Sequence, residues 1–452
     1  MVGDFIQLTG DELQYLVDNL FIGDKLTRNQ IKSHDGVTFN IRNIVSPIIV
    51  FASDGDNISP PPQALGWIVD LYRDVEDIRA VGQTIIYCMA EKIGHLALFV
   101  SAKVGAEQDE EFVQLMDVID CLPPGLYEMV VSSEANDASP GGFATGKWRA
   151  SFEARTLDDI RAVGLNSPGD DRAFAAVARL SEVNLFAYRT FAQPFVRALA
   201  NQPAADLAQA PNPLRLSYTM FASRNPWMNG IQKLANKVTI SRKPADADNP
   251  FLALQTVVSD QIIASLDAYR VVRDQLAEHM FFGFYGSPFV QAILGLKAGS
   301  EVRPLPGLSK AQVAARKSRL EKYTAKLETG GFDEALIRAV IYVFAADRIL
   351  DQRSAFALNL ARQRLMRLSL ADFKILVRDQ FFVLQLEPER AMEALTLLAP
   401  EEETRVALME ELRRIVGAGH PPSIAGRERL DRLSRLLATP IERSATPMTT
   451  GC

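Results

Sequence analysis

The sequence has few of the residues that build disulfide bonds and metal sites. Its 452 residues include three cysteines and four histidines. Cys88, Cys121 and Cys452 have no paired or metal-type spacing, and no two histidines lie close enough for a local metal motif. We therefore expect no metal and no cofactor. An odd number of cysteines without a secretory signal predicts a reducing, cytoplasmic location.

Long apolar runs and an excess of positive charge are also missing. No stretch reaches about 18 uninterrupted apolar residues, so we expect no transmembrane segment. The nearest approach runs from Met280 to Leu296 and is interrupted by Gly286-Ser287-Pro288. It predicts a buried helical hairpin or, alternatively, an apolar surface that touches a lipid-like or polyester phase. The formal net charge of −6 argues against wholesale nucleic-acid binding.

Two candidate functional residues follow two short apolar runs. Asp56 comes shortly after the run from Pro47 to Phe51, and His95 comes after the run from Thr84 to Met89. A carboxylate that orients an imidazole, which in turn removes the proton of a serine or cysteine, performs nucleophilic acyl transfer. The alternatives are a turn-forming role for Asp56 and a structural role for His95, and Asp54 is the rival acid. The order of acid before histidine, each after a predicted strand, favours the catalytic interpretation.

The third member of this triad has no recognisable candidate in the chain. In α/β-hydrolases the nucleophile precedes the acid, yet the 55 residues before Asp56 contain no G-x-S-x-G or G-x-C-x-G. Cys121 follows both other members and has no elbow around it, and Cys88 is expected to be a small buried hydrophobe. We therefore expect the nucleophile to lie upstream of Asp56, outside this chain. The chain would then be a truncated product, a fragment or a gene model that starts at an internal Met, and we expect it to be inactive alone.

The segment from Leu16 to Val100 resembles the C-terminal part of the catalytic domain of polyhydroxyalkanoate synthases. The resemblance lies in the D-x-I-x-P loop from Asp56 to Pro60, the dipeptide Gly94-His95 and the lead-in from Val17 to Leu26. It implies Asp56 as the acid and His95 as the base of an α/β-hydrolase or acyltransferase. The implied partners are hydroxyacyl-CoA thioesters or polyesters as substrates.

A closer resemblance is to a poorly characterised bacterial family of synthase-like α/β-hydrolases, which is described mainly as a domain of unknown function. Members of that family continue beyond the hydrolase part with segments like those that begin here at Arg155, Phe186 and Tyr285. This resemblance covers most of the first 300 residues.

The pattern of apolar residues predicts an α/β part followed by an all-α part. Residues 1–135 are expected to form the C-terminal part of an α/β-hydrolase sheet, followed by a linker (136–171), a helical region (172–300), a helical bundle (301–440) and a disordered tail (441–452). About three strands would leave an unpaired edge and an uncovered apolar face. Unless the helical segments cover that face, we expect homo-oligomerisation.

The predicted bundle is similar to the tellurite-resistance TerB-like helical domain in the stretch from Ala345 to Asp351. That family often has a glycine in an acidic loop where this chain has Arg348. We therefore expect Asp351 to cap a helix rather than to bind a metal with Asp347. The alternative to an acyltransferase is a non-catalytic helical scaffold or stress-response interaction protein, in which the hydrolase remnant is structural.

Overall fold

The computed structural model describes residues 8–21, 25–56, 58–90, 116, 118–133, 143–145, 148–164, 167–222, 225–244, 246, 248–346, 349–365, 367–418 and 421–438. The chain forms two compact units. The helical unit contains Met1–Gly23 and Pro168–Val302, and the α/β unit contains Asp24–Ser167 and Arg303–Cys452. His95, Asp347 and the predicted tail 441–452 lie outside the described residues.

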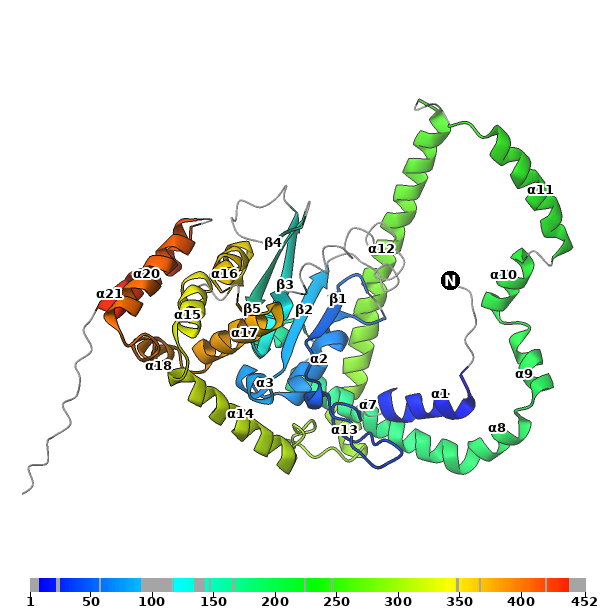
Figure 1. Ribbon diagram of the computed structural model, residues 1–452. Helices are drawn as coiled ribbons and strands as arrows, with labels where there is room; N and C mark the ends of the chain where they lie inside the picture. The colour runs from blue at the N-terminus through cyan, green and yellow to red at the C-terminus, as the bar shows by residue number, and fades with distance from the viewer. Residues whose placement is uncertain are drawn as a thin grey trace, which may run out of the picture. The chain divides into compact units, whose positions relative to one another are not determined.

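The α/β unit is built on a mixed sheet with strand order β1-β2-β3-β5-β4 (Figure 1). The strands β1 (Ile48–Ser53), β2 (Thr84–Ala90) and β3 (Gly125–Ser133) are parallel neighbours. The strand β5 (Trp148–Ala154) is antiparallel to β3, and both β4 (Phe143–Thr145) and β6 (Ile349–Leu350) pair antiparallel with β5. The α/β layout expected for the first part of the chain is thus present.

Two helices make the crossover from β1 to β2. The helix α2 (Pro61–Leu71) begins at a proline, which is pre-organised for the first helical position. The helix α3 (Val75–Val81) begins where the Asp74 side chain accepts the backbone N–H of Asp77. It ends at Gly82, whose φ of +81° favours a residue without a Cβ atom. These local signals fix where each helix starts and stops.

One face of the sheet packs against α2 and α6 (Leu157–Ala162). Because side chains alternate along a strand, Ile85 and Tyr87 of β2 join Leu65 and Ile68 of α2 in one core. Ile86, between them, belongs to the core on the opposite face. Each face of β2 is therefore buried, which explains why its sequence is apolar without alternation.

The C-terminal part of the chain consists mainly of helices, all but the first of which contribute side chains to the core on that opposite face. They are α14 (Lys310–Glu328), α15 (Phe332–Phe344), α16 (Gln352–Arg364), α17 (Leu370–Leu386), α18 (Pro388–Glu393), α19 (Leu395–Leu398), α20 (Glu402–Gly417) and α21 (Ile424–Ala438). A single core joins Tyr127 and Phe152 of the sheet to Leu336 and Val340 of α15. We expected segments 1–135 and 301–440 as separate domains, but their residues 24–135 and 303–440 belong to one unit with a shared core, and residues 1–23 belong to the helical unit.

The stretch 136–171, which we expected to be a linker, contains a central strand. Residues 148–154 form β5, and Ala150 and Phe152 are buried against the C-terminal helices. Arg155, directly after the strand, pairs with Glu128 at 2.7 Å and with Glu153 at 2.6 Å. The sequence Trp-Arg-Ala-Ser-Phe-Glu-Ala alternates apolar and polar residues, which is the pattern of a half-buried strand, so the sequence held a strand signal that the linker prediction overlooked.

The helical unit has one long helix, α12 (Pro250–Tyr285), and a set of shorter elements (Figure 1). These are α1 (Gly10–Leu16), η1 (Val17–Phe21), α7 (Pro168–Ala187), η3 (Tyr188–Ala192), α8 (Gln193–Leu199), α9 (Gln202–Gln209), α10 (Pro213–Phe221), α11 (Pro226–Ser241) and α13 (Pro288–Ile293). Phe174 of α7 packs against Phe281 and Phe282 of α12, with ring centroids 5.1 and 6.3 Å apart. The sheet and the helices described above confirm the expected layout, in which an α/β part is combined with helical segments.

The apolar stretch from Met280 to Leu296 is a break between two helices, as expected, but its outer side chains are not buried. The chain leaves α12 at Gly286 and enters α13 at Pro288. Phe284, Phe289 and Ile293 are exposed, so the prediction of a buried hairpin is wrong for them. No helix in the described part of the chain has the length and apolar content needed to cross a membrane.

Candidate functional site

Asp56 lies in a tight loop directly after β1. Its side chain is buried, and its Oδ1 atom accepts the backbone N–H groups of Ile58 at 2.8 Å and Ser59 at 3.0 Å. The backbone N–H of Asp56 donates to the carbonyl of Ser53 at 3.1 Å. This is an Asx turn, and it fixes the carboxylate at the carboxyl end of the strand. The rival acid Asp54 is exposed on the same loop, so burial favours Asp56.

The loop after β1 lies beside the end of β2. The two strands are parallel and in register to their last residues, with Ser53 opposite Ala90. The backbone N–H of Asp54 donates to the carbonyl of Ala90 at 2.9 Å, which ties the acid loop to the end of the neighbouring strand. The chain toward His95 leaves from this same edge. Because His95 is outside the described residues, the distance between acid and base stays a prediction.

Neither described cysteine has the properties of a nucleophile. Cys88 is largely buried against the sheet core, and burial raises the pKa of its thiol to about 11. A thiol with such a pKa is protonated and unreactive at neutral pH. Cys121 packs against the same core and directly precedes Leu122 and Pro123. The interpretation of Cys88 as a small buried hydrophobe agrees with this packing.

A metal site finds no support in the described part of the chain. No group of three or more histidine, cysteine, aspartate or glutamate side chains gathers there. Asp351 is the N-cap of α16, and its Oδ1 atom accepts the backbone N–H of Ser354 at 3.1 Å. Its other oxygen pairs with Arg353 at 2.6 Å. The predicted helix-capping role of Asp351 is thus confirmed.

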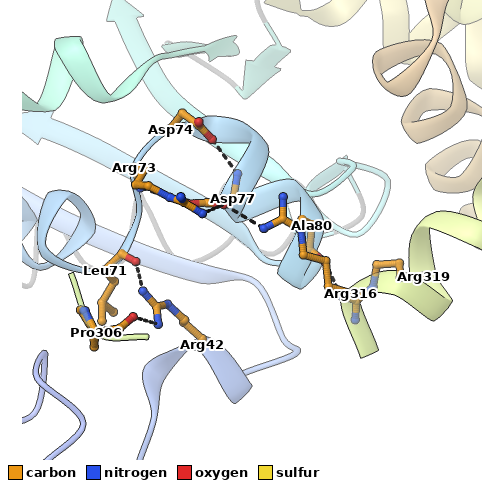
Figure 2. Close-up of polar contacts among 9 residues, drawn as sticks. All are labelled: Arg42, Leu71, Arg73, Asp74, Asp77, Ala80, Pro306, Arg316 and Arg319. Carbon is orange, nitrogen blue, oxygen red and sulfur yellow. Dashed lines mark hydrogen bonds and ion pairs between the residues drawn. The ribbon is translucent and has the colours of Figure 1, made fainter. Parts of the chain in front are cut away.

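Arginine side chains gather around α3, and sequence reasoning missed this cluster (Figure 2). Asp77 accepts hydrogen bonds from Arg73 Nε at 3.0 Å and Arg316 Nη1 at 3.1 Å. Burial alone would raise the pKa of Asp77, but hydrogen bonds and charge from Arg73, with the charge of Arg316, bring it below its usual value. Arg319, one turn along α14, donates to the carbonyl of Ala80 at 2.9 Å.

Arg42 extends this cluster to the segment before α14. Its guanidinium donates to the carbonyl of Leu71 and, at 2.8 Å, to that of Pro306 (Figure 2). Arg42, Arg73 and Arg316 line a small cavity of about 230 Å³. These bonds run to main-chain carbonyls and to Asp77, so we assign the cluster to anchoring α14 on α3. Its local signals were the four-residue spacing of Arg73 and Asp77 and the strong charge of the segment from Lys310 to Leu327.

Comparisons with known proteins give a family without an assigned activity. A family model described as "Protein of unknown function (DUF3141)" matches residues 1–327. The chain is 42% identical over 421 residues to an "Uncharacterized protein in ackA 5'region" of Rhizobium meliloti. The match covers 92% of this chain but 57% of that protein, so the chain spans little more than half the length of this relative. No solved structure has a significant match to the chain.

Proposed function

The chain belongs to the DUF3141 family of proteins of unknown function, and we propose that it is the part of an acyltransferase or hydrolase that carries the acid and the histidine. The substrates proposed are hydroxyacyl thioesters or polyesters, as the resemblance to polyhydroxyalkanoate synthases implies. The observation that carries the proposal is the buried carboxylate of Asp56, fixed at the carboxyl end of β1 beside the strand that leads to His95. Rigid parallel strands present catalytic side chains at this edge in doubly wound folds.

In the proposed reaction, His95 removes the proton from a serine or cysteine that attacks the thioester carbonyl. The tetrahedral intermediate expels the thiolate, which takes the proton back from His95, and the acyl group stays on the nucleophile. Asp56 keeps the imidazole in the required tautomer and stabilises its cationic form. We place the nucleophile in a further part of the protein, because the matched relative is longer than this chain.

A titration of the imidazole groups tests the proposed pair in the 452-residue chain itself. The chain has four histidines, so the His95 signal can be assigned in an NMR spectrum by its loss in His95→Gln. We expect the pKa of His95 to lie above the ordinary value of a histidine and to fall in Asp56→Asn, because a neighbouring carboxylate favours the imidazolium. The exposed neighbour gives the control, Asp54→Asn, which should leave the titration unchanged. An unchanged His95 titration in Asp56→Asn would contradict the proposal.

A helical scaffold that self-associates is the second candidate, and α12 favours it. This helix is 36 residues long with no buried residue. Leu254, Val258, Ile262 and Leu266 are 48% to 60% exposed and recur every four residues along one side. An apolar row of this length is typical of helices that pair with another helix, and we propose a second copy of the chain as the partner.

Light scattering after size-exclusion chromatography tests this self-association. We expect the 452-residue chain to elute as a dimer or larger oligomer, and Ile262→Glu combined with Leu266→Glu to shift it to the monomer. The control is Gln255→Glu, which introduces a negative charge at an exposed position of the same helix outside the apolar row. A parent chain that is monomeric at micromolar concentration would contradict the assignment of α12 to self-association.

A further inference from the structure

The segment that contains α8 to α11 has a charge opposite to that of the whole protein. Residues 193–244 include seven basic residues and one acidic residue, although the formal net charge of the chain is −6. The basic residues are Arg197, Arg215, Arg224, Lys233, Lys237, Arg242 and Lys243, and the acidic residue is Asp206. Such a local excess of positive charge favours contact with an anionic partner.

The same segment presents large apolar side chains to solvent. Trp227 of α11 is 84% exposed, and Ile231, Leu234 and Val238 are more than half exposed. At 100° per residue these four side chains fall on one stripe of α11, and Lys233 and Lys237 lie together along one flank of it. Phe195, Leu199, Leu207 and Phe221 add further exposed apolar groups on α8, α9 and α10. No described residue of α8 to α11 is buried.

Short helices that are both positively charged and apolar on their surface require a partner that binds the charges and also covers the apolar side chains. A helix of 7 to 16 residues gains little stability in water without burying an apolar face. A nucleic acid would satisfy the positive charge but leave Trp227 and its stripe in water. The surface of a bilayer with anionic lipids takes both, because the apolar stripe enters the acyl boundary and the lysines reach the headgroups.

The charge of α12 is opposite to that of α8 to α11, so the two segments are expected to have different partners. This helix contains Asp260, Asp267, Asp274 and Glu278 against Arg270 and Arg273, so an anionic surface would repel it. We propose that α8 to α11 form a peripheral membrane-binding segment that lies in the headgroup layer of anionic membranes. Trp227, Ile231, Leu234 and Val238 are the inserted side chains, and Lys233 and Lys237 contact the lipid headgroups. This proposal does not depend on the proposed acyl chemistry.

Vesicle flotation with the 452-residue chain tests the proposal. We expect binding to vesicles of phosphatidylcholine with phosphatidylglycerol, little binding to phosphatidylcholine alone, and weaker binding as salt concentration rises. Lys233→Glu combined with Lys237→Glu should lower the affinity at least about tenfold. The control is Lys317→Glu on α14, a lysine whose side chain is 79% exposed in the α/β unit, and it should bind like the parent chain.

A second variant tests insertion rather than charge. Trp227→Ala should weaken vesicle binding even at low salt. The fluorescence of Trp227 is the difference between the emission spectra of the parent and Trp227→Phe, and we expect this difference spectrum to shift to the blue when vesicles are added. Because these side chains are exposed, circular dichroism should show the parent's helical content in every variant. Equal binding to both vesicle types, or unchanged binding by the lysine double variant, would overturn the proposal. So would a Trp227→Ala chain that keeps vesicle binding and loses only self-association.

Discussion

Replacing Asp56 with asparagine is expected to lower kcat for hydroxyacyl-CoA turnover by about 10³- to 10⁴-fold. The expectation applies to a protein that includes both this chain and the further part present in its longer relative. Without the carboxylate, the imidazole of His95 adopts the wrong tautomer and its cation loses stabilisation. Release of the free thiol from 3-hydroxybutyryl-CoA measures the rate. His95→Ala should show a loss at least as large.

The choice of asparagine separates the catalytic role of Asp56 from its role in the turn. Asparagine keeps an oxygen that can accept the N–H groups of Ile58 and Ser59, whereas alanine removes both the charge and the turn contacts. Asp54→Asn, on the same loop but exposed, is the matched control and should keep the parent rate. Full activity in Asp56→Asn together with a lowered melting temperature in Asp56→Ala would identify Asp56 as a turn residue only.

Local sequence signals predicted the elements that hold the acid loop. The β-branched run before Asp56 became β1, and the proline-led segment after it became α2. The cap at Asp351 was also predictable, because its partner Ser354 is three residues away. In each case the residues that determine the structure lie within a few positions of one another. Short-range backbone chemistry therefore carried these predictions.

Contacts between distant segments could not be read from the sequence. A pattern shows that a sheet has an apolar face but not what covers it, and here α15 does so from about 200 residues further along the chain. The expected uncovered face is therefore filled within the same chain. The contact between Arg42 and the carbonyl of Pro306 spans 264 positions. A main-chain acceptor has no sequence signature, so this bond could not be anticipated. In the cluster around Asp77, the four-residue spacing of Arg73 and Asp77 is visible in the sequence, but the contact of Arg316 with Asp77 spans 239 positions.

Arg338 gives the second large expected effect, on stability. This residue of α15 is fully buried, and its guanidinium donates to the carbonyls of Leu327 and Ala391, both at 2.9 Å, and to that of Lys326 at 3.2 Å. Its Nε atom donates to Gln380 Oε1 at 2.9 Å. Burial lowers the pKa of Arg338 to about 10, so the side chain stays charged at neutral pH. One side chain thereby joins the end of α14 to α17 and α18.

Arg338→Met is expected to lower the free energy of unfolding by about 3–5 kcal/mol, because methionine fills the space but leaves buried acceptors without a donor. The urea midpoint followed by circular dichroism measures the change. Arg338→Lys should fall between Arg338→Met and the parent, since lysine keeps the charge but not the planar set of donors. The control is Arg378→Met, an exposed arginine on α17. If both methionine variants unfold at the same urea concentration, the four acceptors have found other donors, and Arg338 does not hold these helices together.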